Sequence, residues 1–286
     1  MTARGSITAR AIPRLWRFAV SDKSFSFGLV TLAAVVLVAM LGPVFSPHDM
    51  AETLGPPGLS PVNGAPLGLD YLGRDVLSRV LDGGRSTLLL GLSATVLIYA
   101  VGLLVGLTAG YARTFVDPVL MRTVDLLLSF PALLLMLLFV TAFGSGATTL
   151  VLAAVVVLFP GVARIVRTAT MTVMSRGYVE AAIARGESPQ AIVRREVLPN
   201  IVGPIAADAG VRFGWSIILI ASVNYLGLGL RPPSSDWGLM ISENRTIVAE
   251  NPLALLVPAL LIALLVVAVN MVGDGFARML GRSENR

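Results

Sequence analysis

Residues 253–272 read Leu-Ala-Leu-Leu-Val-Pro-Ala-Leu-Leu-Ile-Ala-Leu-Leu-Val-Val-Ala-Val-Asn-Met-Val, a run without any charged residue. The hydrocarbon core of a bilayer is about 30 Å thick, and about 20 apolar residues in a helix cross it. The rest of the 286-residue chain has the same character, with 55% hydrophobic residues, 14% charged residues and a mean hydropathy of +0.81. This composition excludes an ordinary soluble domain and predicts a membrane protein.

Five further apolar runs have a length close to that of a membrane-spanning helix. They lie at residues 25–45, 86–112, 126–143, 147–163 and about 201–229. The first is too long for the apolar core of a signal peptide and is followed by no small-residue cleavage site, so we interpret it as a retained helix. The sequence therefore predicts an all-α, polytopic membrane protein with six transmembrane helices.

The distribution of basic residues predicts the orientation of these helices. With the N-terminus placed inside, the inner segments carry sixteen Lys and Arg residues and the outer loops carry five. Such an excess is typical of the cytoplasmic side of a membrane protein, so both termini are expected in the cytoplasm. Contact of these loops with anionic membrane lipid accounts for the net charge of +5 without a nucleic-acid partner.

The six helices divide the chain into five regions. We expect a cytoplasmic N-terminal segment (1–24), a first transmembrane helix (25–45), an extracytoplasmic loop (46–85), a five-helix core (86–276) that includes a cytoplasmic loop at 164–200, and a cytoplasmic tail (277–286). Trp237 is expected to anchor the outer interface.

Glycine and proline positions add expectations about helix packing. Gly102, Gly106 and Gly110 share one helix face, as do Gly210 and Gly214, and such faces allow helices to pack closely. Pro131, Pro160 and Pro258 are expected to kink their helices.

The residues that most enzymes and metal sites require are scarce. The chain has no cysteine, one histidine (His48) and one lysine (Lys23), and no phosphate-binding loop of the G-x-x-x-x-G-K-[ST] type. We therefore predict no catalytic residue, no metal site and no cofactor bound by this chain.

The cytoplasmic loop 164–200 is polar and longer than a connector requires. Gly186 can adopt a positive φ and end one short helix, while Ser188 is suited to cap a second helix with Pro189 in its first turn. Leu198-Pro199 is expected to end this second helix before the fifth transmembrane helix begins.

The same loop resembles a motif of a known family. Glu180-Ala181-Ala182, Gly186, Ile192 and Leu198-Pro199 are similar, at the full spacing, to the EAA motif of binding-protein-dependent ABC importer permeases, although Glu196 stands where a histidine is usual. The resemblance implies the type I ABC importer (MetI-like) permease fold and a loop that docks on an ATPase subunit. It assigns this contact to Glu180, Ala181, Ala182, Gly186, Glu187, Ser188, Pro189 and Ile192, with Glu180 facing a basic residue of the ATPase.

Further stretches resemble the DppC/OppC type of permease from dipeptide, oligopeptide and nickel importers. They are Leu67-Gly68, Asp70, Gly73-Arg74-Asp75, Ser78-Arg79, Gly83 and Arg85; Asp125 with Phe130-Pro131; residues 226–238; and Asn270 with Gly273-Asp274. The resemblance implies import of short peptides with a second permease subunit, two ATPase subunits or domains that use ATP and Mg²⁺, and an extracytoplasmic binding protein. Nickel import stays an alternative, and an ion-coupled secondary transporter is the alternative from another class.

Two groups of polar residues are candidates for contact with the cargo or with the binding protein. Asp208 and Arg212, four residues apart, can pair on one helix face, and with Asn224 and Asn270 they either line the translocation path or serve packing. Asp70, Arg74, Asp75 and Arg79 either dock the binding protein or form a lid over the helix ends.

Overall fold

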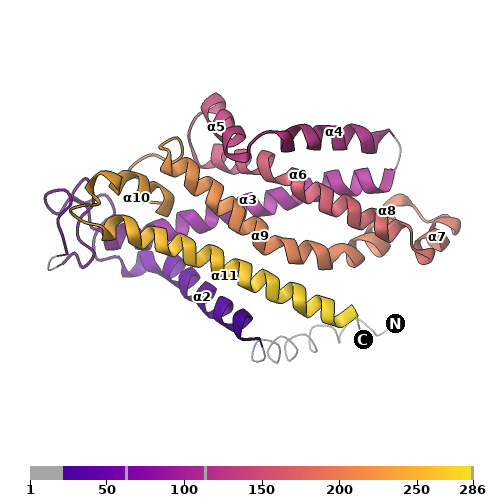
Figure 1. Cartoon of the computed structure of the whole chain (residues 1–286), viewed down its shortest axis with the longest axis horizontal. Coiled ribbons are helices and arrows are strands. Elements are labelled where there is room, and N and C mark those ends of the chain that lie inside the picture. The colour runs from indigo at the N-terminus through magenta and orange to yellow at the C-terminus, as the bar shows by residue number, and fades with distance from the viewer. Residues whose placement is uncertain (1–21, 62–63, 113–114, 285–286) are drawn as a thin grey trace.

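Long α-helices run beside one another along the molecule, and irregular segments gather at one end (Figure 1). The computed structural model describes residues 22–61, 64–112 and 115–284. In chain order the elements are α2 (Lys23–Leu41), η1 (Gly42–Phe45), α3 (Val76–Ala112), α4 (Val116–Ser129), α5 (Ala132–Phe143), α6 (Ala147–Met174), α7 (Gly177–Ala184), α8 (Pro189–Ile192), η2 (Val193–Val197), α9 (Leu198–Tyr225), α10 (Trp237–Asn244), η3 (Arg245–Ile247) and α11 (Leu253–Glu284). Most of the predicted N-terminal segment 1–24 lies outside the described residues.

The predicted helical fold is confirmed. Five helical segments within the described ranges are long and apolar enough to cross a membrane, and a sixth span results if α4 and α5 are counted together. Isolated β-bridges pair Thr53 with Arg74 and Leu69 with Asp75.

The third predicted span, 126–143, differs from the expected single helix. The helical pair α4 and α5 is broken at Phe130-Pro131 and bends by 94°. Pro131 disfavours a helical conformation at Phe130, which is extended (φ −85°, ψ 139°). Pro160 and Pro258, by contrast, lie inside the uninterrupted helices α6 and α11.

The second span begins earlier than predicted, at Val76 instead of residue 86, so the expected loop 46–85 is ten residues too long at its end. Asp75 explains the early start. Its carboxylate accepts hydrogen bonds from the backbone N–H groups of Leu77 and Ser78 and from the Ser78 hydroxyl. An aspartate in this position satisfies the free donors of the first helical turn.

The boundaries of the last two long helices also differ from the prediction. The helix α9 ends at Tyr225, four residues before the expected end at Gly229, and α11 continues through the predicted tail to Glu284. Leu198-Pro199 was expected to end a helix but does not. The Leu198 N–H bonds to the Val193 carbonyl five residues back, and this wider π-type turn carries the helix past Pro199.

The glycine faces pack as predicted. A side chain at Gly102, Gly106 or Gly110 would lie within 3 Å of α6 atoms, and one at Gly210 would lie 2.9 Å from the Val269 carbonyl of α11. The missing side chains let α3 approach α6, and α9 approach α11, at backbone distance.

Residues 46–61, 64–75 and 231–252, which include α10, cover one end of the bundle and are called here the α10 cap. Trp237, expected at a lipid interface, is instead fully buried, and its indole N–H donates to the Val80 carbonyl at 2.9 Å. Asp236 caps α10 and accepts from the Thr87 hydroxyl at 2.7 Å, which fastens α10 to α3.

Candidate functional site

The predicted elbow in the cytoplasmic loop is present at the opposite end of the molecule, in residues 177–197, called here the EAA loop. Gly186 has φ +78° and separates α7 from α8, and the Ser188 hydroxyl accepts from the Ala191 N–H at 3.4 Å. Pro189 occupies the first turn of α8. These three local predictions are confirmed.

The EAA loop has a buried side and an exposed side. Val179, Ala182, Ile192 and Val197 are buried in the main hydrophobic core. Two residues assigned to the ATPase contact, Ala182 and Ile192, therefore lie against the chain's own core and support the loop from within.

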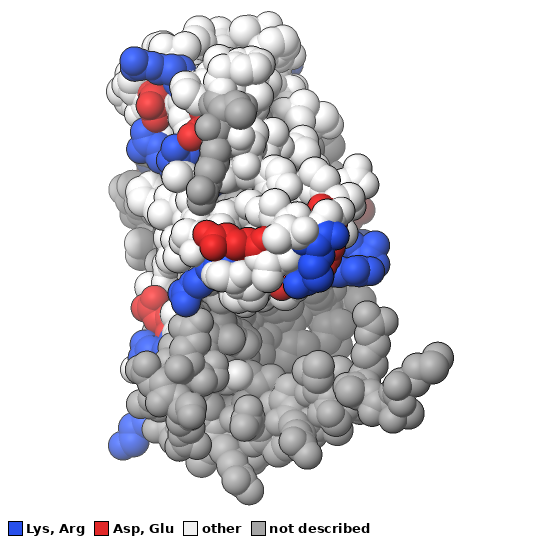
Figure 2. All heavy atoms as spheres, turned by 90° about the vertical axis from the view of Figure 1, so that its right-hand side faces the viewer, with Lys and Arg blue, Asp and Glu red and all other residues white. Residues whose placement is uncertain are grey.

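The exposed side carries Glu180 and Ala181, together with two apolar side chains that the sequence analysis did not single out. Tyr178 is 45% exposed and Ile183 is 49% exposed. Tyr178 and Ile183 alternate with Val179 and Ala182 on one short helix, and this pattern in the sequence could have indicated that the helix has two faces. Figure 2 shows that basic and acidic side chains also gather on this end of the molecule, where Arg185 and Glu187 form an ion pair at 2.6 Å.

A polar junction lies where α3, α6 and α9 meet. The Arg212 Nε donates to the Asp208 carboxylate at 2.9 Å, as the spacing predicts, and the Tyr99 hydroxyl of α3 donates to the same oxygen at 2.7 Å. On α6, a Cβ at Gly161 would lie 2.7 Å from a terminal nitrogen of Arg212. Tyr99 and Gly161 were not predicted, because nothing in their sequence surroundings points to a residue more than fifty positions away.

The other two candidates for the path are placed differently. Asn224 is fully buried, donates to the Asp236 carboxylate at 2.8 Å and accepts from the Leu230 N–H at 2.8 Å, so it joins the end of α9 to the α10 cap. Asn270 is half-buried and donates to the Val266 carbonyl of its own helix. Of the four candidates for the path, Asp208 and Arg212 are the charged ones, and their side chains are 15% and 18% exposed.

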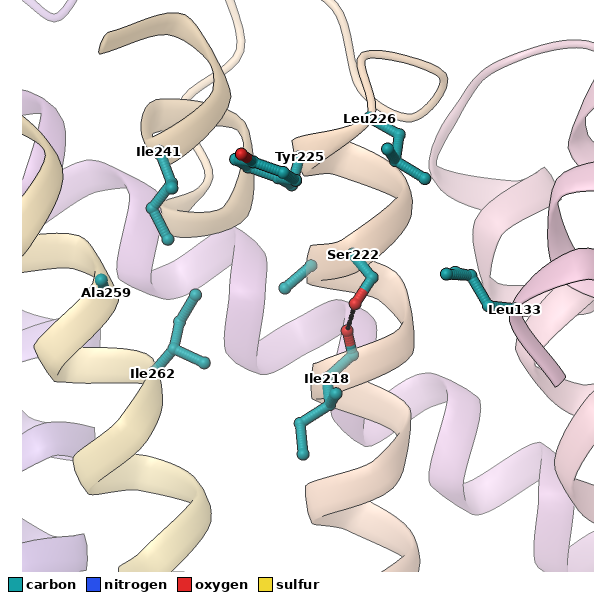
Figure 3. A pocket seen from close by; sticks show the side chains of 9 residues that line it. Leu133, Ile218, Ser222, Tyr225, Leu226, Ile241, Ala259 and Ile262 are labelled. Carbon is teal, nitrogen blue, oxygen red and sulfur yellow. Dashed lines mark hydrogen bonds between the residues drawn. The ribbon is translucent and has the colours of Figure 1, made fainter. Parts of the chain in front are cut away.

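An apolar groove of about 500 Å³ opens between α5, α9, α10 and α11 (Figure 3). Its walls include Leu133, Ile218, Ile241 and Ile262. In Figure 3, Tyr225 of α9 extends toward Ile241 of α10, and Leu133 of α5 points toward α9. Ser222 donates to the Ile218 carbonyl at 2.7 Å, so its hydroxyl is already satisfied within α9. The groove suits an apolar side chain or an acyl chain better than a charged group.

The four residues proposed to dock the binding protein are buried, three in the α10 cap and Arg79 in the first turn of α3. Asp70, Arg74, Asp75 and Arg79 are between 0% and 4% exposed. Asp70 accepts from Arg74 at 2.8 Å and from Arg79 at 2.7 Å, and Glu243 of α10 accepts from Arg79 at 2.7 Å. These side chains form a buried ion-pair network that joins the cap to the first turn of α3.

Glu243 completes this network and raises the pKa of a neighbour. The Tyr71 hydroxyl donates to the Glu243 carboxylate at 3.2 Å. Burial and then the negative charge of Glu243 raise the pKa of Tyr71 above its ordinary value near 10.

In the described part of the chain, no group of three or more His, Cys, Asp or Glu side chains is placed to hold a metal ion.

Comparison with known proteins places these features in a family. The profile of the family described as "Binding-protein-dependent transport system inner membrane component" matches residues 102–286. The di/tripeptide transport system permease protein DppC of Pseudomonas aeruginosa is 34% identical over 271 residues, which is 92% of this chain and 89% of the relative. The glutathione transport system permease protein GsiD of Pectobacterium atrosepticum is 38% identical over 209 residues, which is 73% of this chain and 69% of the relative.

A solved transporter structure has a similar fold. A chain from an inward-facing structure of the MetNI methionine ABC transporter aligns with a TM-score of 0.59 at 19% identity, covering 70% of this chain and 94% of that chain. The predicted resemblance is thus confirmed, and this protein belongs to the family of binding-protein-dependent transport system inner membrane components.

Proposed function

We propose that this chain is a permease subunit of an ATP-driven ABC importer that moves short peptides into the cytoplasm, with both of its termini on the cytoplasmic side. It works with a second permease subunit, two ATPase subunits and an extracytoplasmic binding protein. The ATPase subunits use ATP and Mg²⁺, and this chain binds no cofactor of its own.

The observation that carries this proposal is the form of the EAA loop. One side of the loop is fastened into the core, while the opposite side presents Tyr178, Glu180 and Ile183 to the surroundings. Two apolar groups that flank a carboxylate suit a groove with a basic residue at its centre. The loop also leads directly into α9, so a force applied there reaches the membrane.

The substrate class rests on the relatives. The DppC and GsiD relatives are named as transporters of di- and tripeptides and of glutathione, all of which carry peptide bonds and charged ends. Asp208 and Arg212 offer one charge of each sign inside the bundle and are the residues we propose for contact with the charged ends of a peptide. We assign contact with the binding protein to exposed residues of the α10 cap in place of its buried ion pairs.

Reconstitution of the complex in proteoliposomes tests the proposal. With the second permease, both ATPases and the binding protein present, we expect uptake of a labelled tripeptide that requires ATP hydrolysis. Nickel uptake with no peptide uptake would support the alternative cargo. Uptake by this chain without ATPases, driven by an ion gradient, would contradict the ABC mechanism.

A charge reversal tests the docking surface separately. Glu180→Lys should abolish co-purification of the ATPases, because the exposed carboxylate would become a cation facing a basic groove. Glu250→Lys, a reversal at an exposed position of the α10 cap, should leave co-purification unchanged. Equal ATPase binding by both variants would contradict the assigned contact.

A further inference from the structure

The helix α9 is built differently in its two halves. Residues Pro189–Tyr225 form one continuous helical segment that joins the EAA loop to the α10 cap. The proximal half, up to residue 207, contains Pro199 and Pro204. Each lacks the backbone N–H that would donate a hydrogen bond within the helix. Gly203 precedes Pro204, and a Cβ at Gly203 would meet no atom within 4 Å.

The distal half, 208–225, is fastened at both of its ends. At the first end, Tyr99 and Arg212 donate to one oxygen of Asp208, and the Arg212 guanidinium lies against the backbone of α6 at Gly161. At the other end, the buried bond from Asn224 to Asp236 joins α9 to the cap.

Close to the Asp208–Arg212 ion pair along its length, α9 also packs closely against α11. A Cβ at Gly210 would lie 2.9 Å from the Val269 carbonyl and 3.1 Å from Gly273 of α11. Within one helical turn, α9 is thus held between α11 on one side and α3 with α6 on the other. The proximal half packs through apolar side chains alone: Ile201 is fully buried in the main core, Val202 is 55% exposed, and its described residues form no ion pair.

We propose that Tyr99 and Gly161 are positioning residues that lock the distal half of α9 to α3 and α6 through the Asp208–Arg212 ion pair, so that displacement of the EAA loop is taken up by bending at Gly203-Pro204. This inference rests on the proposed function, because it assumes that an ATPase moves the loop. It adds a division of α9 into a flexible proximal half and a fixed distal half. The distal half then moves with α3, α6 and the cap as one body.

The physical basis is the cost of distorting each half. A helix bends most readily where a proline has removed a backbone hydrogen bond. At Gly203-Pro204 the Gly203 side of the turn is open, and the opposite side packs only through the apolar Ile201 and Ile205. A charged pair within a membrane is costly to separate, since each charge would lose its partner in surroundings of low dielectric constant. Bending therefore concentrates in the proximal half of α9, which precedes Asp208 in the chain.

Because the chain contains no cysteine, spin labels can be introduced at chosen pairs of cysteines. Two pairs use exposed positions on α9 and α3: the proximal pair Val202→Cys with Leu104→Cys, and the distal pair Tyr225→Cys with Leu89→Cys. In the complete complex, addition of ATP with a hydrolysis block should shift the proximal distance and leave the distal distance within its nucleotide-free distribution. An equal shift of both distances, or no shift of the proximal distance, would overturn the proposal.

A second measurement concerns the lock itself. Hydrogen bonds between transmembrane helices contribute about 0.6 kcal/mol on average and up to about 1.7 kcal/mol, so Tyr99→Phe should open the lock about 3- to 20-fold more often. The ATPase rate without binding protein should rise by a similar factor, and the distal distance should now change with ATP. Tyr111→Phe is the matched control, since it lies on the same helix and its hydroxyl makes no hydrogen bond to a described residue.

Gly161→Ala perturbs the same ion pair from the side of α6. The new methyl group would displace the terminal nitrogens of Arg212, which are the flexible end of a side chain, so the fold should survive. Combined with Tyr99→Phe, its effect on the ATPase rate should be clearly less than additive, because both changes act through one ion pair. Full additivity, or wild-type ATPase rates in both single variants, would overturn the lock.

The outcome is separable from that of the proposed function. If the wild-type complex neither hydrolyses ATP nor takes up peptide, the proposed function fails. If it does both and the Tyr99 and Gly161 variants behave as the Tyr111 control does, only the lock fails.

Discussion

Replacing Arg79 by methionine tests whether buried charge holds the α10 cap on the bundle. The Arg79 side chain is fully buried, and one of its terminal nitrogens donates to both Asp70 and Glu243 at 2.7 Å. Methionine fills a similar volume without the charge, so the two carboxylates lose a shared partner. Arg74 still donates to Asp70 at 2.8 Å, so this carboxylate keeps one cationic partner and the destabilisation is smaller.

The size of the effect follows from these contacts. Removal of one partner from a buried ion pair costs about 3–5 kcal/mol. Because Arg74 remains, we take the lower end, about 3 kcal/mol, which corresponds to a roughly 150-fold rise in the population with an open cap.

Hydrogen exchange of the purified protein in nanodiscs measures this opening. The Tyr71 N–H, which bonds to the Asn244 side chain at 3.1 Å, reports on the cap, and amides in the middle of α6 report on the bundle. In Arg79→Met we expect the Tyr71 amide to exchange about 150-fold faster while the α6 amides stay unchanged. Arg245→Met, at an exposed position of the same cap, should change exchange of the Tyr71 amide less than about twofold. If Arg79→Met behaved like Arg245→Met, the buried network would not stabilise the cap.

Three further predictions concern single positions. Gly186→Ala should weaken binding of the ATPase subunits about fivefold in a pull-down titration, because alanine at φ +78° costs about 1 kcal/mol, whereas Gly177→Ala should bind normally. Gly106→Ala should lower the melting temperature in detergent, because its methyl would lie 2.6 Å from α6 atoms and cost about 1–3 kcal/mol. Gly203→Ala, whose methyl would meet no atom within 4 Å, should lower the melting temperature less. The folded-state pKa of Tyr71 is raised, so its contribution to stability is complete below about pH 10 and is lost as the pH rises through the raised value. Tyr71→Phe should therefore make the melting temperature less sensitive to alkali, and an unchanged slope would refute the assignment.

The features that could be predicted from the sequence depend on residues close together in the chain. The apolar runs, the Gly186–Ser188–Pro189 elbow and the Asp208–Arg212 pair each lie within one element or one turn, so their spacing contains the necessary information. The start of α3 was available by the same reasoning, since Asp75 followed by Ser78 before an apolar run is a helix-capping signal.

The features that could not be predicted depend on tertiary pairing. Arg79 and Glu243 are 164 positions apart, and Tyr99 and Asp208 are 109 positions apart. A motif shows that Arg79 is charged but does not show whether it is buried, and burial decides between a docking surface and a structural network. The bend at Phe130-Pro131 falls between these cases, because the proline marks its position while its 94° angle depends on packing.

The two ends of the molecule are stabilised by different means, and this difference bears on how a permease can move. At the cap, charged groups are buried in shared ion pairs, and such networks resist partial opening because each lost partner leaves a buried charge. At the EAA loop, most of α7 and half of α8 are exposed. The ion pair of Arg185 with Glu187 is solvated, so a partner can displace it at little cost. A force applied at the loop therefore deforms the end that is least costly to deform. The cap and the distal half of α9 would then transmit motion to the rest of the transporter as a rigid body.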